Sequence, residues 1–294
     1  MELAYWGLRE QPYRITLSPH RLSLLPHQTI AARRIQSAFA QGERIALLLG
    51  DHGLGKTLLA QHLVGLAEAR GVQSAWAACV PEVSGSALYQ MFLADLGQPF
   101  SLKSSVELRI QLVDHLLPIV SESKSVLLVV DEAQHVPTAT LEELRPLIEM
   151  VSPNGTPGVQ LLLVGTEQLL TQLHGSLQLG LRTWVGCQAE LKALDLAAAE
   201  RYLVQQWKLA GGQPQKHATE EAWSMLAELS NGVPLVLHRL TQRAFTLTEE
   251  LEQKSLDAEI VWEAAQELGL IKEEAETDTP ALPLPVRGHL KDSA

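Results

Sequence analysis

RIALLLGDHGLGKTLL, residues 44–59, is the stretch that decides the fold. Its apolar run, Ile45–Leu49, breaks into a glycine-containing turn, and apolar residues at helical spacing follow. The turn, Gly50–Thr57, has the pattern G-x-x-x-x-G-K-[ST] between an expected buried strand and an expected helix. In that context the pattern indicates a phosphate-binding loop, whereas a bare match can be a chance glycine-rich turn. The stretch therefore predicts an α/β P-loop NTPase that binds ATP.

The loop is expected to hold phosphate mainly through its backbone. Its glycines allow the chain to curl so that successive N–H groups face phosphate oxygens, and the N-terminus of the next helix adds positive partial charge. Lys56 is expected to reach the β- and γ-phosphates, and to contribute little to stability because it would be solvent-accessible in an empty site. We expect the side chains of Asp51 and His52 to point away from phosphate. The residues predicted to bind nucleotide are Gly50, Asp51, His52, Gly53, Leu54, Gly55, Lys56, Thr57 and Leu58.

A second apolar run ends in two carboxylates, in VLLVVDEAQ at residues 126–134. Ligands of open parallel sheets bind at the carboxyl ends of the strands, where these acids would lie. Asp131, together with the Thr57 hydroxyl, is expected to hold Mg²⁺, and Glu132 to polarise the water that attacks the γ-phosphate. Two acids after a strand more often mark a helix N-terminus when they stand alone. Joined to the phosphate loop, they predict a site for ATP and Mg²⁺ with hydrolytic activity.

Thr166 follows a third apolar run, Val159–Val164, and has two interpretations. Its hydroxyl could hydrogen-bond the γ-phosphate or the attacking water. It could equally be the N-cap of a helix that starts at Glu167, since threonine is favoured at that position.

Composition sets outer bounds on the class of protein. The 294 residues are 46% hydrophobic and 19% charged, which is typical of a soluble globular protein, and no apolar run is long enough to span a membrane. The start of the chain lacks a signal-peptide pattern, and the two cysteines, Cys79 and Cys187, match no metal-binding spacing, so we expect a cytoplasmic location. The net charge of −11 argues against passive coating of nucleic acid, although an oligomer could still assemble a basic surface.

Strand and helix patterns divide the chain into four parts. Residues 1–43 are expected to form an irregular N-terminal segment and a first helix that pack on the ATPase core. Strands alternating with helices in residues 44–194 predict a parallel sheet with helices on both faces. Strand patterns then stop, and residues 195–270 are expected to form a small all-α lid domain. The acidic, proline-containing residues 271–294 are expected to be a disordered tail.

The motifs together resemble a known family. YWGLREQPY at 5–13, the loop GDHGLGKT, LLVVDEAQ at 127–134, LLLVGTEQL at 161–169 and RYLVQQWKLAGG at 201–212 resemble the ExeA/GspA-type AAA+ ATPases. That group is itself similar to the TniB/TnsC transposition ATPases and to ORC/Cdc6-like proteins. The resemblance implies a ring- or filament-forming oligomer whose nucleotide lies between subunits. It also implies that residues 26–30 border the adenine.

The chain departs from the family pattern at several positions. Leu54 stands where Thr or Ser is usual, a change that we expect to be tolerated. Of two family arginines before the last strand, Arg182 remains as a possible trans-acting finger, and the other position holds Trp184. Leu235 replaces the usual sensor-2 arginine, and Arg239, one helical turn later, is either a substitute or a solvent-facing residue. An arginine finger can contribute orders of magnitude in rate, so these changes weigh against fast turnover but leave nucleotide binding intact.

Two functions from different classes follow. The first is an ATP-hydrolysing oligomer that acts as a motor or switch on a macromolecular partner, such as DNA, a transposase or a secretion-type protein. The second is a slow or inactive nucleotide-dependent switch that assembles on DNA, as a transposition- or origin-type regulator. A role in secretion or pilus assembly usually needs a membrane helix and a cell-wall-binding domain, and the sequence shows neither pattern.

Overall fold

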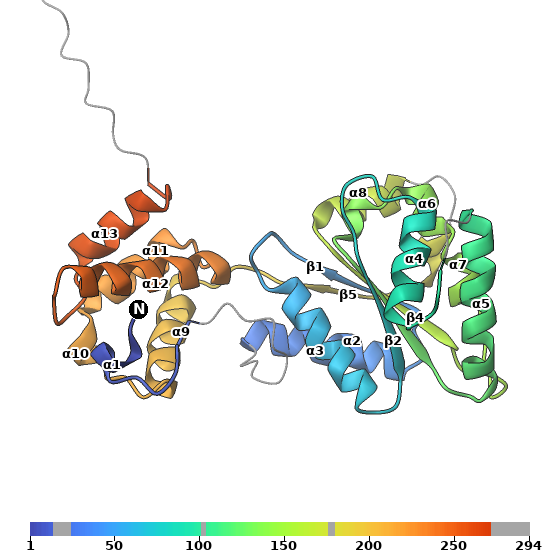
Figure 1. Cartoon of the computed structure of the whole chain (residues 1–294), viewed down its shortest axis with the longest axis horizontal. Coiled ribbons are helices and arrows are strands. Elements are labelled where there is room, and N and C mark those ends of the chain that lie inside the picture. Colours follow the sequence, from blue (N-terminus) through green and yellow to red (C-terminus); the bar gives the residue numbers. More distant parts are fainter. Residues whose placement is uncertain (14–24, 101–103, 176–179, 272–294) are drawn as a thin grey trace, which may run out of the picture.

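A five-stranded parallel sheet lies at the centre of the computed structural model, which describes residues 1–13, 25–100, 104–175 and 180–271 (Figure 1). The strand order is β2-β3-β4-β1-β5, and every neighbouring pair is parallel. The strands are β1 (Ile45–Leu49), β2 (Gln73–Ala78), β3 (Val126–Asp131), β4 (Val159–Gly165) and β5 (Val185–Glu190). The sequence-based prediction of an α/β P-loop fold with helices on both sheet faces is confirmed.

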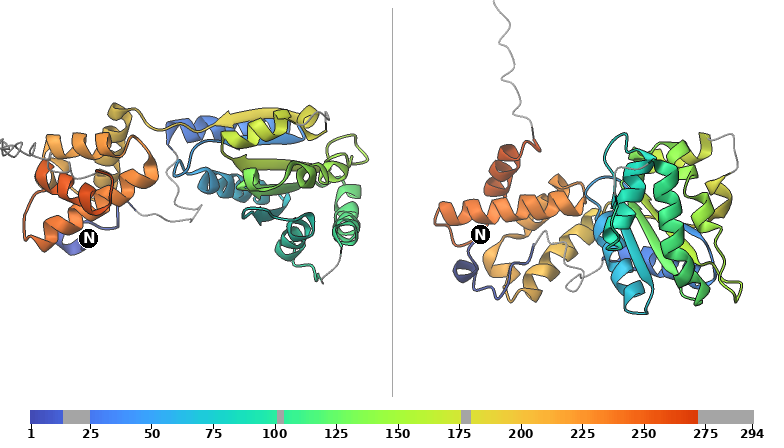
Figure 2. Two further views of the ribbon diagram at one scale, coloured as in Figure 1. Left: turned by 90° about the horizontal axis from the view of Figure 1, so that it is seen from above. Right: turned by 45° about the vertical axis from the view of Figure 1, so that its right-hand side comes forward.

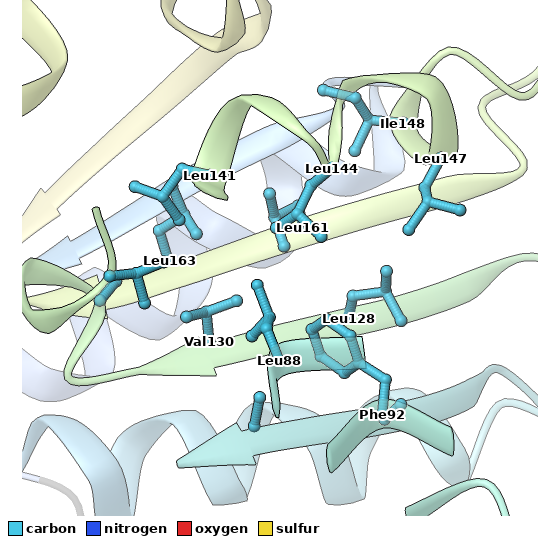
Figure 3. Packing of buried hydrophobic residues seen from close by; sticks show 14 of the residues in the cluster. Leu88, Phe92, Leu128, Val130, Leu141, Leu144, Leu147, Ile148, Leu161 and Leu163 are labelled. Carbon is cyan, nitrogen blue, oxygen red and sulfur yellow. The ribbon is translucent and has the colours of Figure 1, made fainter. Parts of the chain in front are cut away.

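Two sets of helices cover the two faces of the sheet. The helices of this domain are α2 (Pro26–Ala40), α3 (Lys56–Glu68), α4 (Gly85–Asp95), α5 (Ser105–Ser121), α6 (Thr138–Glu142), α7 (Arg145–Ile148) and α8 (Glu167–Gly175), with 3₁₀ turns η2 (Ala133–His135) and η3 (Leu181–Trp184). Helices α2 and α3 pack on the face that carries Leu48 and Val164, and α4 to α8 cover the face that carries Leu47 and Leu163. Figure 3 shows the second core, in which side chains of α4, α6 and α7 meet those of β3 and β4.

Burial on both faces explains the continuous apolar runs. Leu47 lies beside Leu163 and Leu48 beside Val164 in the β1–β4 register, and these neighbouring positions point to opposite faces. Because each face is covered by helices, both alternating sets of side chains must be apolar. All six residues of β3 are buried as a result, Asp131 included.

Two short helices, α6 and α7, stand where the apolar spacing of residues 140–150 would also suit one continuous helix. Pro146 lies in the first turn of α7, where its missing N–H and fixed backbone angle are tolerated. The same residue cannot supply the hydrogen bond that would continue α6, so the chain turns between them. A proline two-thirds of the way along an apolar-periodic segment was the signal for this break.

The C-terminal helices form a second domain with its own core. They are α9 (Leu196–Leu209), α10 (Pro214–His217), α11 (Glu220–Leu229), α12 (Pro234–Glu250) and α13 (Ala258–Glu267). The rings of Trp207 and Phe245 stack at its centre with centroids 4.1 Å apart. Figure 2 shows this helical domain beside the sheet domain in both views. The part of the expected tail from residue 272 onward lies outside the described residues.

The N-terminal segment belongs to the helical domain, which corrects its expected placement on the ATPase core. Residues 1–13 include a short helix, α1 (Leu3–Trp6), and Figure 1 shows it among α9 to α12. Trp6 packs edge-on against Phe245 with centroids 5.0 Å apart, and the Tyr13 hydroxyl donates to the carbonyl of Leu203 at 2.7 Å. Of the described residues in the expected first part, α2 lies on the sheet domain, against β1 and β5, and the turn after it contacts β4 through Glu43. Large aromatic side chains bury most area where a matching aromatic core exists, and that core is in the helical domain.

No helix in the described ranges is both long and apolar enough to cross a bilayer.

The link between the two domains is hydrogen-bonded to a glycine of the helical domain. Leu194 donates its N–H to the Gly232 carbonyl at 2.9 Å, and a Cβ at Gly232 would lie 1.9 Å from the Leu194 oxygen. Gly232 also has a φ of +68°, a left-handed conformation that is unfavourable for residues other than glycine.

We expect Gly232→Ala to destabilise the protein more than Gly97→Ala does. Both glycines have a φ of +68°, but nothing lies within 4 Å of a Cβ at Gly97. The strain of the left-handed conformation, about 1–2 kcal/mol, is therefore common to both variants, and only Gly232→Ala must also displace the Leu194 backbone. Urea unfolding measures the two free energies of unfolding. Equal losses would show that the link tolerates the added methyl group.

Candidate functional site

The loop Gly50–Thr57 lies between β1 and α3, as its sequence predicts, and its glycines touch three other segments. A Cβ at Gly50 would lie 2.7 Å from the Leu191 carbonyl oxygen, at the start of the link to the helical domain. A Cβ at Gly53 would lie 2.9 Å from Val233 of the helical domain, and one at Gly55 would lie 2.8 Å from Gln28 Nε2 of α2. Glycine is thus required here for close packing as well as for the positive φ of Gly53 (+81°) and Gly55 (+86°).

Hydrogen bonds from two of these segments, α12 and α2, hold the loop. The Leu235 N–H, at the start of α12, donates to the Gly53 carbonyl at 3.2 Å. The amide of Gln28, 4% exposed, donates to the Leu54 carbonyl at 3.2 Å. The loop carbonyls are therefore held by protein groups, while the first N–H groups of α3 have no partner within their own helix and can serve an anion.

Lys56 is buried, contrary to the expected solvent access. It is 5% exposed, and its Nζ donates to the Asp51 carbonyl at 2.9 Å. Burial lowers the pKa of Lys56, while the charges of Glu132, Asp131 and Asp51 act in the opposite direction. The ammonium thus already lies inside the loop, and its removal would leave the Asp51 carbonyl without this donor.

Thr57 and Asp131 meet where β3 ends beside the loop. The Thr57 hydroxyl donates to Asp131 Oδ2 at 2.8 Å, and the Glu132 N–H donates to Asp131 Oδ1 at 3.0 Å. Burial raises the pKa of Asp131, and these two hydrogen bonds partly oppose that shift. One hydroxyl and one carboxylate fit Mg²⁺, which keeps several waters and takes further oxygens from substrate phosphates. Within the described residues no cluster of three or more His, Cys, Asp or Glu side chains forms an all-protein metal site.

Glu132 and Thr166 lie at the ends of the neighbouring strands β3 and β4. Glu132 has a left-handed backbone (φ 54°, ψ 41°), and its Oε2 accepts a hydrogen bond from Gln134 Nε2 at 2.6 Å. Thr166 is 9% exposed, and its Oγ1 has no hydrogen-bond partner. The N-cap interpretation of Thr166 requires that oxygen to accept a backbone N–H of α8, so it is wrong. A buried hydroxyl without a partner fits a site that receives a polar ligand.

The remaining loop side chains differ in burial. Asp51 and His52 are exposed. Leu54 is 2% exposed and belongs to the core beneath α2 and α3, so this departure from Thr or Ser is accommodated by apolar packing. Leu235 lies over Gly53, and Arg239 is exposed on α12.

Arg182 lies away from the phosphate loop of its own chain. It is exposed in η3, just before β5, and the first residue of β5, Val185, pairs with Ile45 at the start of β1. The loop follows the other end of β1, and five residues of strand span roughly 16 Å. The Leu181 N–H donates to Glu142 Oε1 at 3.0 Å, which holds this turn on α6. Trp184 has a structural partner, since its ring lies 4.7 Å from the Arg44 guanidinium carbon.

Two residues of the site were missed from sequence. Gln134 follows the two acids of β3 directly, and a buried amide at that position could have been anticipated. Gln28 gave no signal, because its contact with the loop depends on how α2 packs. That residues 26–30 border the adenine stays a prediction; among them, Gln28 contacts the loop and Ile30 is 68% exposed.

Comparisons with known proteins agree with this architecture. Residues 39–173 match a family model described as an AAA domain. The chain is 25% identical over 249 residues to General secretion pathway protein A of Aeromonas hydrophila, in an alignment that covers 83% of this chain and 44% of that protein. The chain therefore spans less than half the length of this relative.

Solved structures share the fold at lower identity. Cdc6p from Pyrobaculum aerophilum has a TM-score of 0.69 at 18% identity, covering 91% of this chain and 71% of its own. The ORC1 protein of Aeropyrum pernix in complex with DNA has a TM-score of 0.63 at 19% identity, covering 84% of this chain and 66% of its own. These likenesses extend across both domains and support the fold alone.

We expect Thr166→Val to lower the turnover of ATP without lowering the stability of the protein. Replacing a buried, unpaired hydroxyl with a methyl group should leave the free energy of unfolding unchanged or higher. If the hydroxyl serves the γ-phosphate or the water, turnover should fall about 10²-fold, with ATP affinity little changed. Urea unfolding and initial-rate measurements check the two parts.

The matched control is Thr241→Val in α12. Thr241 is fully buried, and its hydroxyl donates to the Leu237 carbonyl at 2.7 Å. This variant should lose about 0.5–1.5 kcal/mol of stability and keep its turnover. A Thr166→Val protein that is destabilised and turns over at the parent rate would show that the hydroxyl is structural.

Proposed function

We propose that this AAA-domain chain binds ATP with Mg²⁺ in the loop Gly50–Leu58 and hydrolyses it to ADP and phosphate. The observation that carries the proposal is the 2.8 Å contact between Thr57 and Asp131 beside the buried Lys56. Residues 74 positions apart in sequence thus place a hydroxyl, a carboxylate and an ammonium together at the carboxyl end of the sheet. A phosphate chain with a divalent cation needs this set of groups.

The side chains have separate roles in this reaction. Lys56, which already lies in the loop, exchanges the Asp51 carbonyl for phosphate oxygens. Thr57 and Asp131 hold the cation, which would neutralise charge on the phosphates. Glu132 accepts the proton of the attacking water, and the Thr166 hydroxyl orients that water or the γ-phosphate. Each role uses an atom that the fold holds at the same edge of the sheet.

Arg182 supports an oligomeric form of the enzyme. Because it lies beside the start of β5, it can act only on the nucleotide of another subunit, as a trans-acting finger in a ring or filament. The alternative is that Arg182 pairs with a carboxylate of a helical domain. A finger stabilises charge that develops in the transition state, so it affects turnover more than ATP binding.

A slow switch is the second candidate, and the helical domain favours it. Leu235 contacts the loop with an apolar side chain at the position where the family has its sensor-2 arginine, and Trp184 packs on Arg44 at the position of the second finger arginine. Such a protein would change its assembly with bound nucleotide and turn over slowly. The likenesses to a general secretion pathway protein and to an ORC1 protein in complex with DNA support, as partners, a secretion-type protein or DNA. A transposase remains a further candidate from the family resemblance.

The experiment that tests hydrolysis uses Glu132→Gln. The amide keeps the shape of the side chain but not its basicity, so ATP should still bind while turnover falls about 10²–10⁴-fold. Trapped ATP should also increase the fraction of oligomer. Phosphate release and gel filtration with ATP, with and without duplex DNA, measure both effects. A parent protein that binds ATP without releasing phosphate would favour the switch, and hydrolysis at the parent rate in the variant would remove the base role of Glu132.

Mixing two variants with complementary defects tests the trans-acting finger. Arg182→Ala should lower turnover and keep ATP affinity, while Lys56→Met should lose ATP binding. A mixture should regain part of the activity, because the Lys56 variant still supplies a finger and the Arg182 variant still supplies a nucleotide site. The specific activity of the parent should also rise with protein concentration. Activity that is independent of concentration, with no recovery on mixing, would exclude a finger in trans.

A further inference from the structure

The side chain of Gln134 connects the ends of two strands at the nucleotide site. Its Nε2 donates to Glu132 Oε2 at 2.6 Å, and its Oε1 accepts the N–H of Thr166 at 3.2 Å. Glu132 follows β3 and Thr166 follows β4, so one amide links the expected base to the turn that carries the unpaired hydroxyl. Gln134 itself is 7% exposed, which excludes most solvent from both hydrogen bonds.

The orientation of this amide is set by chemistry. A backbone N–H can only donate, so the group that faces Thr166 must be the amide oxygen. The amide nitrogen then faces Glu132, whose carboxylate can only accept. A flipped amide would lose both hydrogen bonds and leave buried polar groups without partners, which is destabilising.

Neighbouring groups lie against the backbone and the amide of Gln134. Gln172 Nε2 of α8 donates to the Gln134 carbonyl at 2.8 Å. A Cβ at Gly165 would lie 2.6 Å from Gln134 Oε1, so glycine lets the amide approach β4 this closely. The backbone of Glu132 is left-handed, a conformation that is unfavourable for residues with a side chain. Such a conformation persists only where the surrounding structure holds the residue in place.

We propose that Gln134 is a positioning residue, which holds the Glu132 carboxylate against the Thr166 turn so that base and hydroxyl keep a fixed separation. The assignment rests on the proposed hydrolysis of ATP. This role needs no contact between Gln134 and nucleotide, because both hydrogen bonds of its amide go to protein groups. Its loss should therefore release the rotamers of Glu132 and lower kcat, while the loop, Lys56 and the cation ligands continue to bind ATP.

The test is Gln134→Met, which keeps the length of the side chain and removes both hydrogen-bonding groups. We expect kcat to fall about 10–100-fold, since misplacement of a reacting group by about 1 Å can cost 10²-fold, and the Kd for ATP to stay within about twofold. The matched control is Gln172→Met, which removes one hydrogen bond from the same cluster without touching Glu132, and it should keep kcat within about twofold. Equal losses in both variants would overturn the assignment and indicate general loosening of the cluster.

A double variant separates positioning from structural damage. Once Glu132→Gln has removed the base, there is no base to position, so adding Gln134→Met should lower kcat by less than twofold further. Independent, multiplicative losses would overturn the assignment. Should Gln134→Met fail to fold, Gln134→Glu keeps the acceptor for Thr166 and places a like charge against Glu132. That variant should show the same loss of kcat at unchanged ATP affinity, and parent-like kcat would overturn the assignment.

Phosphate release by the parent protein separates the proposed hydrolysis of ATP from the proposed role of Gln134. If the parent binds ATP and releases no phosphate, the proposed hydrolysis fails, and the positioning role falls with it. If the parent hydrolyses ATP and Gln134→Met retains its kcat, hydrolysis stands and only the role of Gln134 is overturned.

Discussion

Close backbone approach at the phosphate loop is the constraint on which the rest of the structure depends. The three glycines of the loop touch the link to the helical domain, the start of α12 and the start of α2, each so closely that an added Cβ would displace a neighbouring atom. The loop therefore contacts the sheet domain, the helical domain and α2. A ligand that rearranges the loop must alter contacts with all three, so the feature that binds phosphate can also transmit its presence.

Burial and charge pairing act in opposite directions on two ionisable groups of the site. Burial lowers the pKa of Lys56 and raises that of Asp131, so the surroundings disfavour the charged form of both groups. Their mutual attraction and the hydrogen bond from Thr57 offset this only in part. A cation beside Asp131 and phosphates beside Lys56 would stabilise both charges, and a ligand that binds only the folded state stabilises that state by mass action.

Local patterns predicted the parts of the fold that depend on local chemistry. The loop motif and the apolar runs before Gly50 and Asp131 were sufficient for the sheet, since a strand buried on both faces must be continuously apolar. The same patterns brought Thr57 and Asp131 to one edge, because the carboxyl ends of parallel strands meet there. The roles of the site residues, Arg182 included, remain predictions, since the fold alone does not test them.

What the sequence did not predict depends on packing between distant segments. Periodicity could not assign the aromatic residues of positions 5–13 to a domain, because either core could have accepted them. The burial of Lys56 requires the loop to close on its own carbonyl, a tertiary effect that no pattern encodes. The contact of the Gln134 amide with Thr166 was missed for a similar reason, since it depends on the pairing of β3 with β4.

The docking of α1 on the helical domain affects the order in which the protein can fold during its synthesis. Trp6 and its hydrogen-bond partner Glu249 are 243 positions apart, and a ribosome adds that many residues in roughly 12–50 s. The sheet domain, whose strands end at Glu190, is complete well before α12 emerges. Through that interval the first thirteen residues, with two tyrosines and a tryptophan, have no core to join. Among the described residues the helical domain therefore folds after the sheet domain, and its aromatic N-terminal segment waits for α12 before it can be buried.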